Sequence, residues 1–146
     1  MTAFTIRETD WAHDAGRLSA IRRAVFIDEQ GVPEALEWDA DDADALHLLA
    51  TLADGTPIGC ARLLRNDHLC GHIGRMAVLP AWRGRGVGRA LLAAAIRLAR
   101  AQGHATIRLS AQTHAARFYA DAGFAAMGDP YEEAGIPHIA MQKCLN

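Results

Sequence analysis

The chain has 146 residues, of which 51% are hydrophobic and 22% are charged, and its net charge is −2. This length predicts a single domain over residues 1–146. The weak negative charge argues against a nucleic-acid partner, and the lack of an apolar run of ~18 residues argues against a membrane protein. Three cysteines without metal or disulfide spacing favour reduced thiols and a cytoplasmic protein.

Short apolar runs predict strands in the first half of the chain. Their ranges are Phe4–Arg7, His47–Leu52, Ile58–Arg65 and Leu69–Leu79. An apolar stripe at helical spacing after the candidate N-cap Asp10 predicts a helix that ends near Phe26. Residues 27–44 contain Gly31 and Pro33, so we expect an acidic excursion there with at most one short helix.

This excursion concentrates negative charge. No Lys or Arg occurs from Ala24 to Ala61. Eight carboxylates crowd the same part of the chain: Asp28, Glu29, Glu34, Glu37, Asp39, Asp41, Asp42 and Asp44. Such a run is either a solvated loop or a surface that attracts a cationic substrate, and the second alternative predicts an activity that falls with salt.

A glycine-rich turn, Arg83-Gly84-Arg85-Gly86-Val87-Gly88, opens the second half of the chain after Pro80 ends the preceding strand. A helix is predicted from Val87 to its C′ residue Gly103. The remaining predicted elements are a strand at Thr106–Ser110, a short helix from Thr113 or His114 to Ala122, and a strand at His138–Cys144. Strand, turn, helix and strand within a largely antiparallel sheet predict an α+β fold with one parallel crossover.

The glycine-rich turn predicts phosphate binding. Successive N–H groups at a helix N-terminus point at one spot and carry the positive end of the helix dipole. Glycine lets the main chain approach an anion closely, and three arginines, Arg83, Arg85 and Arg89, add charge. The chain lacks the Gly-Lys pair of a P-loop, and Arg89 stands where a dinucleotide fingerprint needs glycine.

The same turn matches the Q/R-x-x-G-x-G/A signature of the GNAT N-acetyltransferase superfamily, and the expected strand, Arg75–Val78, precedes it. Residues 118–124 resemble the second helix of that family and its following strand, and residues 25–33 and 133–138 resemble a branch of small bacterial members. The resemblance covers nearly the whole chain. It implies a GNAT-like fold, in which a twisted, mixed, mostly antiparallel sheet flanked by helices is splayed at the strand before the turn.

The resemblance also implies an acetyl-CoA-dependent N-acyltransferase that transfers the acetyl group directly to a primary amine of a small molecule or peptide. Acetyl-CoA is the expected co-substrate, and no metal is expected. The implied CoA-binding residues are Met76, Ala77, Val78, Arg83, Gly84, Arg85, Gly86, Val87, Gly88, Arg89, Gln112 and Tyr119. The amide of Met76 or its neighbour would face the thioester oxygen, where an oxyanion forms.

Catalytic side chains follow less directly from the resemblance. Tyr119 matches the family tyrosine that protonates the departing thiolate, whereas the alternative is an aromatic residue in the core. Three candidates remain open for the general base: His72 on the strand before the turn, Glu29 in the acidic excursion and His138 at the start of the last strand.

Two other functions remain open from the sequence. One alternative is a non-catalytic acyl-CoA-binding sensor, and the other is an enzyme that binds another nucleotide at the turn. The acceptor amine, the acyl chain and the choice between monomer and homodimer stay open as well.

Overall fold

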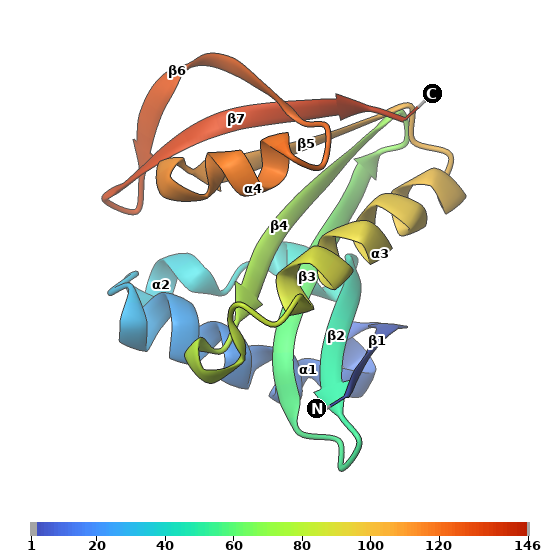
Figure 1. Ribbon diagram of the computed structural model, residues 1–146, viewed down its shortest axis with the longest axis vertical. Coiled ribbons are helices and arrows are strands. Elements are labelled where there is room, and N and C mark those ends of the chain that lie inside the picture. Colours follow the sequence, from blue (N-terminus) through green and yellow to red (C-terminus); the bar gives the residue numbers. More distant parts are fainter. Residues whose placement is uncertain (1–2, 146) are drawn as a thin grey trace.

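The computed structural model describes residues 3–145 and contains one mixed sheet of seven strands in the order β1-β2-β3-β4-β5-β7-β6 (Figure 1). The strands are β1 (Phe4–Thr9), β2 (Leu46–Leu52), β3 (Pro57–Asp67), β4 (Cys70–Val78), β5 (Thr106–Gln112), β6 (Ala125–Glu133) and β7 (Ile136–Cys144). Only β4 and β5 pair in parallel, and the other neighbours are antiparallel. The sheet confirms the predicted α+β fold with one parallel crossover.

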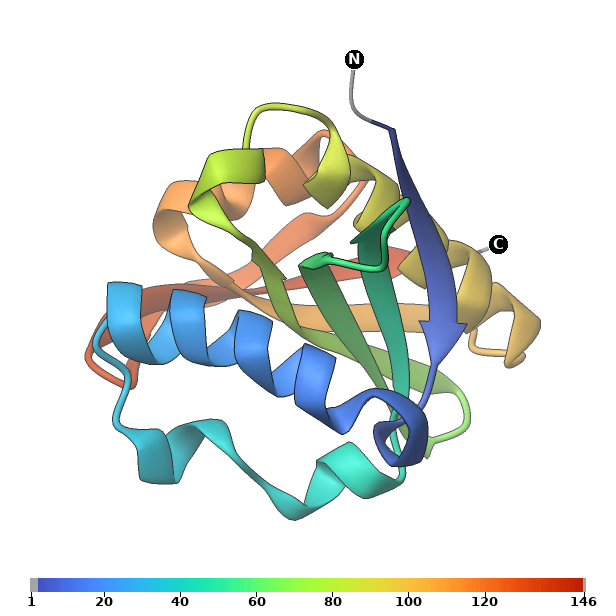
Figure 2. The same cartoon turned by 90° about the horizontal axis from the view of Figure 1, so that it is seen from below.

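Helices cover both faces of the sheet. Their ranges are α1 (Trp11–Arg22), η1 (Arg23–Glu29), α2 (Glu34–Glu37), η2 (Ala40–Ala43), η3 (Pro80–Trp82), α3 (Val87–Ala101), η4 (Thr113–Ala115) and α4 (Ala116–Ala120). Helix α1 lies on one face and α3 on the other (Figure 2). No helix among residues 3–145 is long and apolar enough to cross a membrane.

The sheet divides the core into two clusters. Alternating side chains of one strand point to opposite faces, so Leu48 packs on the α3 side while its neighbour Leu49 packs on the α1 side. The α3 side holds the larger cluster because the apolar stripe of this amphipathic helix is buried along its whole length. The smaller cluster consists of Leu18, Ile21, Val25, Leu49, Cys60 and Ala77.

The first helix is longer than the sequence predicts. It begins after the predicted N-cap Asp10, whose side chain accepts from the amide of His13 at 2.9 Å. Its helical path does not end near Phe26, because a π-helical segment follows and the amide of Gln30 donates to the carbonyl of Val25 at 3.1 Å. The left-handed Gly31, with φ of 73°, then ends it.

The acidic excursion differs from its prediction. It contains two short helical turns, α2 and η2, rather than at most one. The second turn forms because the side chain of Asp39 accepts from the amide of Asp41 and caps it.

The residue pattern gave no bounds for strand β6, although the resemblance of residues 118–124 implies a strand after the short helix. It pairs with β7 through a turn in which Ala134 and Gly135 both have positive φ, as a two-residue hairpin requires. A register shift between Met127 and Tyr131 interrupts the pairing, and it coincides with the segment Gly128-Asp129-Pro130. These residues are typical of turns, and they hide the strand pattern.

Candidate active site

The sheet opens between β4 and β5. The two strands pair only at residues 70–73 and 106–109, and they separate beyond Ile73 and Leu109 (Figure 1). Strand β4 carries a bulge at this point, because Arg62 pairs with Gly74 and Cys60 pairs with Ala77, which leaves Arg75 and Met76 opposite a single residue of β3. The gap confirms the predicted splay at the strand before the turn.

The glycine-rich turn presents free amides beside this gap. Gly84 and Gly86 have φ of 74° and 84°, a region that favours glycine, and a Cβ atom at either position would meet no atom within 4 Å. Gly86 is the N-cap of α3 and has no side chain to cap the helix. The first amides of α3 therefore lack an intrahelical or side-chain partner, which suits them to bind a phosphate.

The arginines of the turn have different surroundings. Both terminal nitrogens of Arg83 donate to the carboxylate of Glu29 at 2.7 Å, and its Nε donates to the carbonyl of Val78 at 2.9 Å. Arg85 lies over the ring of Trp82 at 5.0 Å. Arg83 thus links the end of η1 to β4 and the turn, while the exposed side chains of Arg85 and Arg89 remain available to an anion.

Tyr119 reaches across the gap to β4. Its hydroxyl donates to the sulfur of Met76 at 3.7 Å, and its ring meets Phe118 and Phe124 edge to face. Burial of the phenol raises the pKa of Tyr119 to about 12, so the hydroxyl stays protonated at neutral pH. The structure thus brings the predicted acid next to a residue predicted to bind the thioester.

Gln112 is the last residue of β5, the strand on the other side of the gap. Its side-chain amide donates to Oε1 of Gln30 at 2.8 Å, and its own Oε1 lies 2.8 Å from Nε2 of His114. The link to Gln30, which follows η1, was not predicted. A predicted CoA ligand therefore also joins β5 to the end of η1.

His138 lies beside Gln112. The two residues are register partners on β7 and β5. The imidazole is buried, its Nδ1 lies 2.7 Å from the carbonyl of Ile136, and its Nε2 lies 3.6 Å from a carboxylate oxygen of Glu133. A proton on Nδ1 satisfies the carbonyl and leaves Nε2 with its lone pair, ready to accept a proton.

The other two base candidates lie elsewhere. His72 is exposed on the part of β4 that still pairs with β5, opposite Arg108, before the strands separate. Glu29 is held by Arg83, whose hydrogen bonds lower the pKa of the Glu29 carboxylate. A lowered pKa makes this carboxylate a weaker base.

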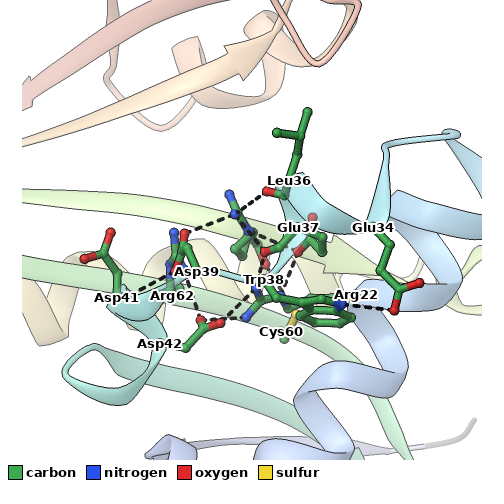
Figure 3. Close-up of polar contacts among 11 residues, drawn as sticks. Arg22, Glu34, Leu36, Glu37, Trp38, Asp39, Asp41, Asp42, Cys60 and Arg62 are labelled. Atoms are coloured by element: carbon green, nitrogen blue, oxygen red, sulfur yellow. Dashed lines mark hydrogen bonds and ion pairs between the residues drawn. The ribbon is translucent and has the colours of Figure 1, made fainter.

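Several carboxylates of the acidic excursion form ion pairs with arginines outside it (Figure 3). Glu37 and Asp42 are buried and accept from Arg22 of α1 at 2.8 and 2.7 Å. Three further pairs join Asp39 to Arg62 at 2.8 Å, Asp39 to Arg75 at 3.2 Å and Glu34 to Arg23 at 2.6 Å. Much of the excursion is thus a neutralised cluster, which weakens the expected attraction of cationic substrates and leaves it a prediction.

A hollow in the surface lies away from the gap. It measures about 690 Å³ and lies beside the start of α1, between Asp10 and Arg65. Its lining includes none of the predicted site residues. We therefore place the candidate site at the gap and not at the hollow.

Comparison with known proteins shows the family and the fold of the chain. A family model described as an acetyltransferase (GNAT) domain matches residues 11–145. The chain is 34% identical to YjcF, an uncharacterised N-acetyltransferase of Bacillus subtilis, over 84% of this chain and 87% of that protein. It is 31% identical to an acyl-CoA N-acyltransferase from Pseudomonas aeruginosa, whose crystal structure superimposes with a TM-score of 0.87 over 97% of this chain and all of that one. Escherichia coli ElaA gives 30% identity and a TM-score of 0.85 over 97% and 99% of the two chains.

Proposed function

This chain belongs to the GNAT acetyltransferase family and is an acyl-CoA-dependent N-acyltransferase, and we propose that it transfers the acetyl group of acetyl-CoA directly to a primary amine in the gap between β4 and β5. One observation carries the proposal. The hydroxyl of Tyr119 spans the gap to Met76, next to a helix N-terminus whose amides are uncapped. A proton donor and a phosphate site thus flank the same opening.

The uncapped amides of the turn bind the pyrophosphate of the substrate in this proposal, and the edge of β4 from Met76 to Val78 binds its pantetheine arm. The neutral amine attacks the thioester carbon, and the amide of Met76 stabilises the resulting oxyanion. The carbon–sulfur bond then breaks, its electron pair stays on sulfur, and Tyr119 donates a hydrogen bond or its proton to the thiolate.

The amine must also lose a proton, and we propose His138 as its acceptor. Nε2 of His138 is free to accept, and Glu133 lies close enough to stabilise the resulting imidazolium. His72 and Glu29 remain alternatives, but one lies before the strands separate and the other is bound to Arg83.

The proposal is tested by CoA release from acetyl-CoA across a panel of primary amines, with the acetylated product identified by mass spectrometry. Acetyl-CoA binding without CoA release for any amine would instead favour a sensor.

The base is tested by replacing each candidate with glutamine. His138→Gln should lower kcat by about 10²-fold at neutral pH, near the low end for a general base, and by less at high pH, where the amine deprotonates without help. His72→Gln is the matched control on an exposed strand position, and Glu29→Gln tests the carboxylate. A larger loss in either of these variants would assign the base to that residue.

A further inference from the structure

The bulge in β4 places a strained residue directly before the proposed oxyanion donor. Arg75 has φ of 47°, in the left-handed region that side chains other than glycine rarely adopt. Among residues 3–145, the other non-glycine residue with positive φ is Ala134, in the β6–β7 turn. A strained conformation of this kind persists only where the surrounding structure holds it.

The side chain of Arg75 makes contacts that fix this backbone conformation. Its Nη2 donates to the carbonyl of Glu37 at 2.9 Å and to a carboxylate oxygen of Asp39 at 3.2 Å. Its Nε lies 3.0 Å from a carboxylate oxygen of Glu37, an ion pair outside hydrogen-bond geometry. Arg75 thus ties β4 to the segment that contains α2, although this segment lies 38 residues earlier in the chain.

The groups that hold Arg75 are themselves fixed by a second layer. Glu37 is bound to Arg22, which is 1% exposed, and Arg22 also binds Asp42. Arg62 of β3 bridges Asp39 and Asp42 at 2.8 and 3.0 Å (Figure 3). The Arg22 guanidinium also lies 5.1 Å from the ring centre of Trp38. Arg22, Glu37 and Asp42 are buried and joined by hydrogen bonds. These bonds favour one arrangement of the groups that anchor Arg75, although Nε of Arg62 has no hydrogen-bond partner among residues 3–145.

A separate hydrogen bond fixes the backbone of the bulge. The thiol of Cys60, on β3, donates to the carbonyl of Arg75 at 3.3 Å. Burial raises the pKa of Cys60 to about 12, which keeps the thiol protonated and able to donate. The strained residue is therefore held through its side chain and through its carbonyl.

We propose that Arg75 is a positioning residue: its attachment to Glu37 and Asp39 fixes the bulge so that the amide of Met76 points at the thioester oxygen. The inference rests on the proposed function, because it gives Met76 the oxyanion. Rotation of the peptide that joins Arg75 to Met76 would redirect this amide, and the ion-pair cluster opposes that rotation. The cluster thereby connects the first helix and the acidic excursion to the reacting atoms.

The test compares the carbonyl stretch of bound acetyl-CoA, labelled with carbon-13 at the carbonyl, in the wild type and in Arg75→Gly. Glycine tolerates the positive φ, so the variant removes the anchor without adding backbone strain. We expect acetyl-CoA to bind within about threefold of wild type while the carbonyl stretch moves toward its value in water. Loss of one oxyanion donor costs 10²–10³-fold in kcat, and a misdirected donor should cost roughly 10–100-fold.

Two further variants keep the test decisive. Arg65→Gly makes the same substitution on neighbouring β3, away from the gap, and should leave kcat and the carbonyl stretch unchanged. Glu37→Gln weakens the ion pair between Glu37 and Arg75 from the Glu37 side. We expect it to shift the carbonyl stretch in the same direction as Arg75→Gly, but by less. If Arg75→Gly does not fold, Glu37→Gln takes its place in the test. A wild-type stretch and kcat in Arg75→Gly, or a loss of kcat that follows the melting temperature alone, would overturn the inference. In either case the wild-type enzyme would still acetylate amines. If the proposed function were wrong, the wild type itself would transfer no acetyl group to an amine.

Discussion

Tyr119 shows how burial defines the role of one side chain. A phenol with a pKa of about 12 stays protonated, but it is a weaker acid than a thiol, whose ordinary pKa is about 8.5. Full proton transfer to a free thiolate is therefore uphill at this site. The phenol acts mainly by donating a hydrogen bond as charge develops on sulfur, and solvent completes the protonation.

We accordingly predict that Tyr119→Phe lowers kcat by about 10–100-fold, at and below the low end for a general acid, without a change in the melting temperature. The ring and its edge-to-face contacts with Phe118 and Phe124 remain, and acetyl-CoA affinity should change little. The measurement is CoA release at saturating acetyl-CoA beside melting curves of both proteins. An unchanged rate would show that Tyr119 is only an aromatic residue of the core.

Local motifs predicted the position of Tyr119 beside the gap and the backbone of the turn, because each depends on residues close together in the chain, while their chemical roles stay predictions. Contacts across long stretches were not predictable in this way. Gln112 meets Gln30 across 82 residues, and Arg75 meets Glu37 across 38. The sequence shows eight carboxylates in a stretch without Lys or Arg, but the fold brings arginines from α1, β3 and β4 to several of them.

The two ends of helix α3 differ in their proposed roles: the N-terminus belongs to the candidate phosphate site, and the C-terminus only ends the helix. Its sequence has an apolar stripe and glycines at both ends, so its limits were predicted closely. Gly86 at the start and Gly103 after the end both have φ of 84°. Only Gly86 lies at the helix N-terminus, whose amides we propose to bind phosphate, so Gly103 is a matched control for it.

We predict that Gly86→Asp abolishes the thermal stabilisation that CoA gives the wild type. One-site binding contributes about 2.7 kcal/mol at a hundredfold excess of ligand over Kd, and a carboxylate at the turn repels phosphate. Gly103→Asp imposes the same backbone strain at the other end of the helix and should keep the CoA-dependent shift. Melting curves with and without CoA decide the matter, and equal shifts in the two variants would exclude the turn as the site.

For the whole molecule, buried charge should make stability depend on pH. Hydrogen bonds from Arg7 hold the pKa of Asp14 well below its usual range. Burial opposes ionisation of Asp42, but its bonds to Arg22 and Arg62 outweigh burial and lower its pKa too. Burial also lowers the pKa of His47. Each of these groups binds protons more readily in the unfolded chain, so acid favours unfolding.

The expected outcome is a free energy of unfolding that falls in two stages as pH decreases. His47 contributes below about pH 6.5, where an unfolded histidine becomes charged, and the two aspartates contribute below about pH 4. Urea unfolding at pH 7.5, 5.5 and 3 measures both stages. His47→Gln should remove the first stage selectively, and a free energy that is constant down to pH 3 would contradict the assignment of these groups.

The neutralised excursion also determines how the enzyme responds to salt. Glu34, Glu37, Asp39 and Asp42 each lie within an ion pair, and opposite charges so close together produce little field at the distances over which a substrate is steered. In the proposed site, in contrast, the phosphates of acetyl-CoA would lie beside the exposed arginines of the turn. We therefore predict that kcat/KM for a cationic amine, measured at saturating acetyl-CoA, changes by less than about twofold between 0.05 and 0.5 M salt. The KM for acetyl-CoA should rise over the same range, because salt screens the attraction between its phosphates and the arginines. Initial rates with a cationic and a neutral amine of equal size measure both effects, and a steep fall of kcat/KM for the cationic amine alone would show that the excursion attracts the acceptor after all.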